Sequence, residues 1–283
     1  MARRVDGPSR ARPAAADERP HRAAWRSSLT HVEPNRILVR GYPVDEAMGR
    51  ISYGEAAYLL LVGELPTPAI GKLMEAVLVA MIDHGATPPS TLAARNVATS
   101  GAPLRACVAA GVLGFGTYHG GDIEDCVRML EHGVAIVRDG ATYEEVAARL
   151  VREFSGKHLP VPGFGHRIHT HDPRVARLFQ MALELELDGP HLKLVRTIER
   201  ALNATRPPDA RIPVNVVGAV AGVCGDIGLG PALGHALFII SRVPGLIAQS
   251  LEEQDREKPM RQIDSSMVVY DGPKERRLPG TRK

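Results

Sequence analysis

Histidine and arginine side chains stand beside glycines in three apolar stretches of the chain. These stretches are residues 82–85, 118–121 and 160–174. Histidine titrates near neutral pH, so it can move a proton or donate a hydrogen bond at a reacting centre. Glycine allows backbone conformations, and a close approach to a ligand, that a side chain would block. The pattern predicts a binding site with proton-transfer chemistry, although a single histidine is more often an ordinary core or surface residue.

Arg174 lies at the end of the longest of these stretches. Asp172 can cap the helix that Pro173 opens, which places Arg174 in the first turn of that helix. A cation there is unfavourable by about 0.3–1 kcal/mol. This cost suggests an anionic partner such as a substrate carboxylate. The alternative is an exposed arginine on a solvated face.

The histidines of the same stretch do not indicate a metal site. Their spacing matches no zinc pattern, and no cysteine or acidic pair nearby completes a ligand set. Three cysteines, an odd number with wide spacing, argue against a disulfide framework and favour a reducing cytoplasm. Each has small apolar neighbours and is expected to be buried and inert: Cys107, Cys126 and Cys224.

Helical signals cover most of the chain. The pairs Ser52–Glu55 and Thr142–Glu145 have the spacing of a capping box. Segment 214–224 is almost wholly apolar and should be buried. Apolar periodicity predicts helices over 56–62, 69–82, 91–99, 106–115, 146–154, 173–187, 192–204, 214–224, 232–242 and 245–257.

Strand signals are confined to residues 36–40 and 267–270. No alternation of strands and helices appears, which argues against a Rossmann sheet. The chain is therefore expected to be all-α. Its 283 residues, 44% of them hydrophobic, can bury a sizeable core, which excludes wholesale disorder.

Positive charge is concentrated at the N-terminus. The formal net charge is +3, whereas residues 1–26 alone carry +4, so the remainder is nearly neutral. A nearly neutral body lacks the basic face that nucleic-acid binding requires. Residues 1–26 are rich in Arg, Ala and Pro and contain no apolar run, so we expect a disordered tail and neither a signal peptide nor a membrane anchor.

Several motifs, in this order, resemble the citrate synthase superfamily. They are the stretch from Gly41-Tyr42-Pro43 to residue 67, His119-Gly120-Gly121, residues 163–167 with Asp172-Pro173-Arg174, residues 242–248, and Tyr270-Asp271-Gly272. The resemblance covers residues 29–272. The chain is shorter than full-length citrate synthases and is most similar to compact citryl-CoA lyases, including the lyase module of ATP citrate lyase.

The resemblance implies a role for each matching residue. His119 would donate to the thioester oxygen and stabilise an enol, and His166 would polarise the ketone or take up the hydroxyl proton. His84 would hydrogen-bond the oxo-acid. The expected carboxylate-binding residues are Arg174, Arg242 and, across a dimer, Arg261. Part of the coenzyme A site is expected at Val161, Pro162, Gly163, Phe164 and Gly165.

Val217 departs from the family pattern, which has a catalytic aspartate in an Asn-Val-Asp motif. Here the motif reads Asn215-Val216-Val217. Asp226 is no obvious substitute, because nine residues of helix span about 13 Å. Three explanations remain open. The enzyme works as a lyase with water or His119 supplying the last proton, it uses a donor whose carbanion arises by decarboxylation, or it binds a CoA ester or carboxylate without turnover.

The resemblance implies an all-α, two-domain citrate-synthase-like fold with the active site in the cleft. The large domain would comprise residues 27–121 and 229–272, the small domain 122–228, and a C-terminal tail 273–283. The expected activity is acyl-CoA-dependent cleavage or condensation of citrate type, with a coenzyme A thioester as substrate and no permanently bound cofactor. A cytoplasmic homodimer is expected, without nucleic-acid or membrane partners.

Overall fold

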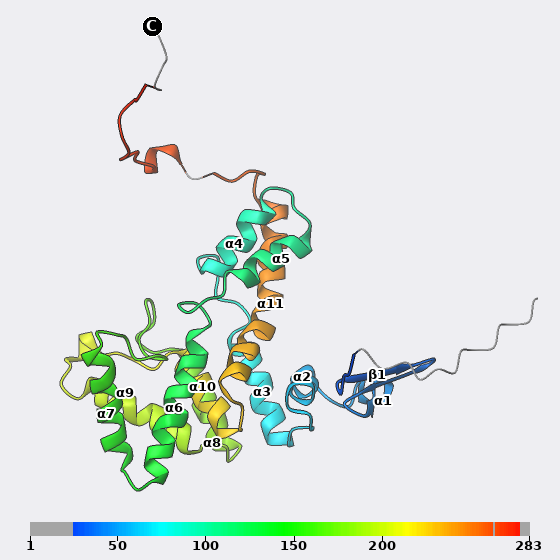
Figure 1. Cartoon of the computed structure of the whole chain (residues 1–283), viewed down its shortest axis with the longest axis vertical. Helices are drawn as coiled ribbons and strands as arrows, with labels where there is room; N and C mark the ends of the chain where they lie inside the picture. The colour runs from blue at the N-terminus through cyan, green and yellow to red at the C-terminus, as the bar shows by residue number, and fades with distance from the viewer. Residues whose placement is uncertain (1–24, 263, 278–283) are drawn as a thin grey trace, which may run out of the picture.

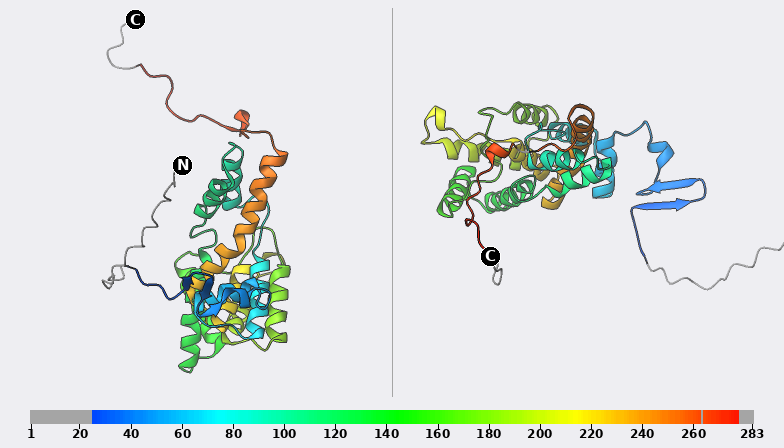
Figure 2. Two further views of the ribbon diagram at one scale, coloured as in Figure 1. Left: turned by 90° about the vertical axis from the view of Figure 1, so that its right-hand side faces the viewer. Right: turned by 90° about the horizontal axis from the view of Figure 1, so that it is seen from above.

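The computed structural model describes residues 25–262 and 264–277. The tail predicted over 1–26 lies almost entirely outside the described residues, as does the end of the predicted C-terminal tail. The described part begins with a small antiparallel sheet, β1 (Thr30–Glu33), β2 (Arg36–Val39) and β3 (Tyr42–Pro43), followed by α1 (Val44–Ala47). This sheet stands out to one side of the helices (Figures 1 and 2). The strand predicted over 36–40 is confirmed as β2.

Helices form the rest of the body, which confirms the all-α prediction (Figure 1). Ser52 and Thr142 cap their helices with complete capping boxes, and Asp172 accepts the backbone N–H of Arg174, as the sequence predicts. The helices up to the core are α2 (Tyr53–Val62), α3 (Pro68–Ala80), α4 (Pro89–Ala98), α5 (Leu104–Leu113), α6 (Asp122–Arg138), α7 (Tyr143–Gly156), α8 (Pro173–Glu184) and α9 (Pro190–Asn203).

The centre of the main core is α10 (Val216–Asp226). Every residue from Gly218 to Cys224 is buried, which confirms the prediction for this apolar segment. The helix packs against α6, α8 and α9 and also touches α11 (Pro231–Arg256). Because α10 is covered within the chain, its apolar surface needs no second subunit.

The two helices predicted over 232–242 and 245–257 are one helix, α11. Pro244 lies inside it and cannot donate the usual backbone hydrogen bond, which normally breaks or kinks a helix. Packing against α3, α4, α5 and α6 on either side of Pro244 keeps the helix continuous. Its C-terminal half packs beside the α4–α5 pair, away from the main core (Figures 1 and 2).

Two further predictions differ from the structure. Helix α6 was not expected, because it follows Gly121 without a side-chain cap. The strand expected over 267–270 is wrong: the chain forms a 3₁₀ turn, η2 (Ser265–Met267), and then continues without regular structure. Val268, Val269 and Tyr270 are exposed there, so neither a neighbouring strand nor a core covers them within the described chain.

By length and hydropathy alone, α11 could cross a membrane. In this fold part of α11 packs against the neighbouring helices, with Leu237 and Leu246 fully buried and Glu253 in an ion pair with Arg95. A core helix of a globular protein passes the same test of length and hydropathy.

The cysteines are free and buried, as predicted. Burial raises the pKa of the Cys224 thiol to about 12 and that of the Cys126 thiol further still. Thiols with such pKa values stay protonated at neutral pH and are poor nucleophiles.

Asp226, considered above as a substitute for the missing acid, accepts backbone hydrogen bonds at the N-terminus of α9. Its carboxylate accepts the backbone N–H groups of Gly189, His191 and Leu192 and also contacts His191 Nδ1, all at 2.9–3.0 Å. We expect Asp226→Ala to lower the free energy of unfolding by about 3 kcal/mol, because several buried donors lose their acceptor. Urea denaturation measures this, with exposed Asp209→Ala as the control, and equal losses in both variants would contradict the assignment.

Candidate active site

Residues 161–165 are tied to the start of α10. The backbone N–H of Gly165 donates to Pro213 at 2.7 Å, and that of Asn215 donates to Gly163 at 3.0 Å. Gly163 has φ +85°, and a Cβ there would lie 2.6 Å from the Cα of Gly218. Only glycine permits this conformation and this close contact without strain. The loop is therefore held rigidly beside the N-terminus of a buried helix.

His166 leaves this loop with its ring orientation set by the backbone. Its Nδ1 accepts hydrogen bonds from the N–H groups of Ile168 and His169, both at 3.0 Å. In the neutral ring the proton must therefore be on Nε2, which becomes a hydrogen-bond donor. Burial, with a further contribution from His169, lowers the pKa of His166 below 6.5, so the ring is neutral at physiological pH.

His84 comes from the loop after α3 and lies against His166, with ring centroids 5.7 Å apart. Burial lowers its pKa, and the positive charges of Arg174 and Arg242 lower it further. Neither ring nitrogen of His84 has a hydrogen-bond partner within the described part of the chain. The ring is thus neutral and available to a ligand.

His119 belongs to the turn before α6. Its Nε2 lies 2.7 Å from Oγ of Ser90, and its ring packs edge-on against Phe238. Burial, followed by the charges of Arg242 and His84, lowers its pKa to about 4. His119 is therefore neutral over the physiological range.

Ser90 is a site residue that the sequence reasoning missed. Ser90 lies in the first turn of α4, whose N-cap is Pro88 and makes no side-chain bond. Ser90 is fully buried, and its hydroxyl faces His119, 29 residues away in sequence. A buried hydroxyl needs a partner, but nothing in the sequence identifies which one.

Arg242 is almost completely buried on α11. Its Nε donates to the carbonyl of Met81 at 2.9 Å, and its guanidinium lies 4.9 Å from the Phe238 ring centroid. Its buried NH1 nitrogen has no hydrogen-bond partner among the described residues. A buried, unpaired donor is costly in the free protein and is satisfied when an anion binds.

Arg174 already has an anionic partner inside the chain. Its Nε and NH2 donate to both oxygens of Asp172, at 2.9 and 2.7 Å. Asp172 therefore already offsets the cost of a cation at this helix N-terminus, so the position of Arg174 does not by itself require a substrate carboxylate. Its role in carboxylate binding stays a prediction. NH1 makes only a long contact, 3.4 Å, to the carbonyl of Ala80.

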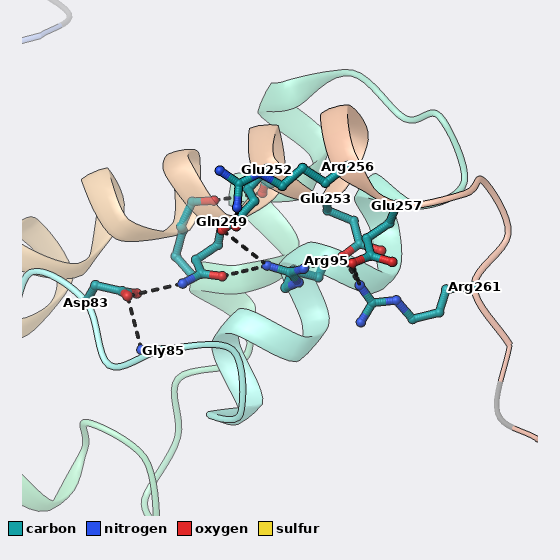
Figure 3. Close-up of polar contacts among 11 residues, drawn as sticks. Asp83, Gly85, Arg95, Gln249, Glu252, Glu253, Arg256, Glu257 and Arg261 are labelled. Atoms are coloured by element: carbon teal, nitrogen blue, oxygen red, sulfur yellow. Dashed lines mark hydrogen bonds and ion pairs between the residues drawn. The ribbon is translucent and has the colours of Figure 1, made fainter.

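Arg261 does not lie with the histidines of its own chain. Its NH2 pairs with Glu253, and its backbone N–H donates to Thr99 Oγ1 at 2.8 Å, near the far end of α11 (Figure 3). Glu253 also pairs with Arg95 at 2.8 Å.

Val217 occupies the second position of α10. Its backbone N–H donates to Oδ1 of Asn215 at 2.9 Å, and its side chain packs against the core. No carboxylate stands at this position, and Asp226 is occupied at the opposite end of the helix.

The arrangement combines three neutral imidazoles with two arginines and suits a polyanion. Loops and helices far apart in sequence contribute these groups, and their charges influence one another's pKa values. A cavity of about 280 Å³ borders the turn that carries His119, and its lining includes Gly116, Thr117 and Gly121 but none of the three site histidines. In the described ranges, no group of three or more His, Cys, Asp or Glu side chains could hold a metal ion.

Comparisons with known proteins identify relatives of this fold. The family model for the citrate synthase C-terminal domain matches residues 66–262. Citryl-CoA lyase from Hydrogenobacter thermophilus superposes with a TM-score of 0.81 and 38% identity, over 90% of this chain and 98% of the lyase. Citrate synthase 2 of Bacillus subtilis is 28% identical over 217 residues, 75% of this chain and 55% of that protein.

A more distant relative has a different length. ATP-citrate synthase beta chain protein 1 of Arabidopsis thaliana is 24% identical over 216 residues, which is 70% of this chain and 34% of that protein. The chain thus spans between a third and just over half the length of these curated relatives. The family model nevertheless covers well over half of this chain. The chain belongs to the citrate synthase family.

Proposed function

We propose that the protein is an acyl-CoA-dependent carbon–carbon lyase of citrate type, which cleaves citryl-CoA to acetyl-CoA and oxaloacetate or catalyses the related condensation. The observation that carries this proposal is the cluster of neutral His84, His119 and His166 with Arg174 and Arg242. Its support is a structural match that covers 90% of this chain and 98% of a citryl-CoA lyase. A coenzyme A thioester is then a substrate, and no permanently bound cofactor is needed.

Arginine is suited to the carboxylates of such a substrate. The unpaired NH1 of Arg242 would bind one carboxylate, with the remaining N–H groups of Arg174 as a second contact. Residues 161–165 would contact coenzyme A beside the N-terminus of α10. Arg261 would reach a site only in a partner protomer.

The tautomer of His166 favours one of its two proposed roles. With Nδ1 occupied by two backbone donors, Nε2–H can polarise the carbonyl oxygen that forms at C3 but cannot accept the hydroxyl proton. Neutral His84, beside it, would accept that proton. The bond between C2 and C3 then breaks, its electron pair enters the thioester as an enolate, and His119 donates to the enolate oxygen.

The enolate carbon still needs a proton. The family's aspartate is replaced by Val217, so we infer that water, or His119, delivers this proton to C2. Protonation completes acetyl-CoA, and the C3 ketone leaves as oxaloacetate. In the cleavage direction the acid is needed only after the carbon–carbon bond has broken, whereas condensation must begin with proton abstraction from acetyl-CoA.

The assembly is part of the same proposal. We retain the two domains inferred above, 27–121 with 229–272 and 122–228, closing over the site. Helix α5 leaves apolar surface uncovered, with Leu113 85% exposed, which supports a homodimer. The free, buried cysteines support a cytoplasmic location.

The test is incubation of the purified protein with citryl-CoA, and separately with acetyl-CoA plus oxaloacetate, while oxaloacetate, acetyl-CoA and free CoA are followed. We expect oxaloacetate and acetyl-CoA to appear in equal amounts from citryl-CoA. Val217 specifically favours a second candidate, a homologue that binds without turnover. Saturable binding of citryl-CoA or oxaloacetate with no product would establish that candidate instead.

A further inference from the structure

One face of α11 holds the chain segment that leads directly into His84. Arg242 Nε donates to the carbonyl of Met81. One turn later, Gly245 lets the helix touch the next carbonyl, because a Cβ at Gly245 would lie 2.3 Å from the oxygen of Ile82. The backbone before His84 therefore rests on this helix without room for adjustment.

Gln249 extends this face by one more turn. Its Nε2 donates to Asp83 Oδ2 at 3.1 Å, and the same oxygen accepts the backbone N–H of Gly85 at 3.0 Å. Gln249 thus donates to a carboxylate that joins the two neighbours of His84 in sequence, Asp83 and Gly85 (Figure 3). Gly85 has φ +76°, a left-handed conformation that glycine adopts without strain.

The orientation of the Gln249 amide is forced by its two neighbours. Arg95 NH1 lies 2.8 Å from Oε1 and can only donate, whereas the Asp83 carboxylate can only accept. Arg95 is itself held by Glu253, whose side chain is fully buried and which also pairs with Arg261 (Figure 3). The amide therefore stands between a fixed donor and a fixed acceptor.

We propose that Gln249 is a positioning residue for His84, acting through the Asp83 carboxylate, and that Arg95 fixes it in the donating orientation. The inference rests on the proposed function, in which His84 contacts the oxo-acid. Gln249 itself touches no substrate. Without its N–H donor, the Asp83 carboxylate loses its hydrogen bond to α11, so the Asp83–Gly85 turn is held there by packing alone and the distance from His84 to His166 is no longer fixed.

The experiment compares Gln249→Leu, Gln249→Glu and a control, Gln254→Leu, in the full-length protein. The glutamate variant can still accept from Arg95, but it replaces the donor to Asp83 by a second carboxylate, so it breaks the contact with Asp83 and adds repulsion, whereas the leucine variant removes the contact without adding charge. Gln254 lies on the same helix and donates to the carbonyls of Ala98 and Ala102, away from Asp83. Two readouts are used: citryl-CoA cleavage kinetics with oxaloacetate calorimetry, and the ring ¹⁵N signals of His84 against pH.

We expect both Gln249 variants to raise KM and weaken oxaloacetate binding by about tenfold or more, with a smaller change in kcat. The His84 signals should shift and its pKa move toward 6.5, as the ring becomes less buried and moves away from the charges of Arg174 and Arg242. Gln254→Leu should match the wild type. Gln249 variants that behave as Gln254→Leu in both readouts overturn the inference. If the wild type neither cleaves citryl-CoA nor binds oxaloacetate, the proposed function fails, and the His84 signals alone then decide the positioning role.

Discussion

Replacing His119 by alanine is expected to slow citryl-CoA cleavage by about 10²–10³-fold. In the cleavage step negative charge collects on the thioester oxygen, and a hydrogen-bond donor fixed there lowers the barrier. His119 is held for this task between Ser90 Oγ and the Phe238 ring. Single-turnover measurements of acetyl-CoA formation test it, because they separate chemistry from product release. A matched control is His132→Ala, which removes an exposed histidine from α6.

The pH dependence of cleavage provides a second check on His119. Its pKa is lowered to about 4, so the ring is neutral above that pH and gains a proton only as the pH falls through 4. His119 should therefore introduce no change in rate between pH 5 and 9, whereas an ordinary histidine would titrate near 6.5. An unchanged cleavage rate in His119→Ala would remove the residue from the catalytic machinery.

Replacing Val217 by aspartate is expected to speed exchange of the acetyl-CoA methyl protons with deuterated water by about 10²–10⁴-fold. The exchange requires a base at the α-carbon and is independent of carbon–carbon bond formation. The N-terminus of α10 favours a negative charge at this position. Partial burial of the side chain opposes ionisation. Mass spectrometry of acetyl-CoA over time measures the exchange directly.

The control for this experiment is Val217→Asn, which has the shape of aspartate but no acid. Thermal unfolding of both variants shows whether the pocket tolerates a polar side chain. Cleavage and condensation are directions of one reaction, so their rates remain tied by the equilibrium constant, and only the exchange step isolates the base. Rapid exchange in the wild-type protein would contradict the idea, since another residue would then be acting as the base.

Local signals in the sequence determined most of the helices. Ser52 and Thr142 cap helices because their hydroxyls accept a backbone N–H three residues ahead, an interaction that needs no distant partner. Gly163 and Gly165 are free to adopt their positive φ because glycine has no side chain, which the sequence alone shows. The all-α class, the buried α10 segment and the family resemblance followed from such patterns.

The tertiary structure decided which side chains have partners. Arg174 is neutralised by Asp172, Ser90 serves His119 instead of capping α4, and Arg261 pairs with Glu253. α6 begins without a capping side chain, and α11 continues through Pro244. Packing between distant helices outweighs local preference in both cases.

In the candidate active site, too, the sequence identified residues and the fold determined their arrangement. Sequence motifs singled out His84, His119, His166 and Arg242 as candidates, but they are separated by tens of residues along the chain. Only the fold brings His84 within 5.7 Å of His166, leaves NH1 of Arg242 buried and unpaired, and sets the tautomer of His166. Burial and neighbouring charge, which depend on three-dimensional distance, therefore determine the protonation states on which the chemistry depends.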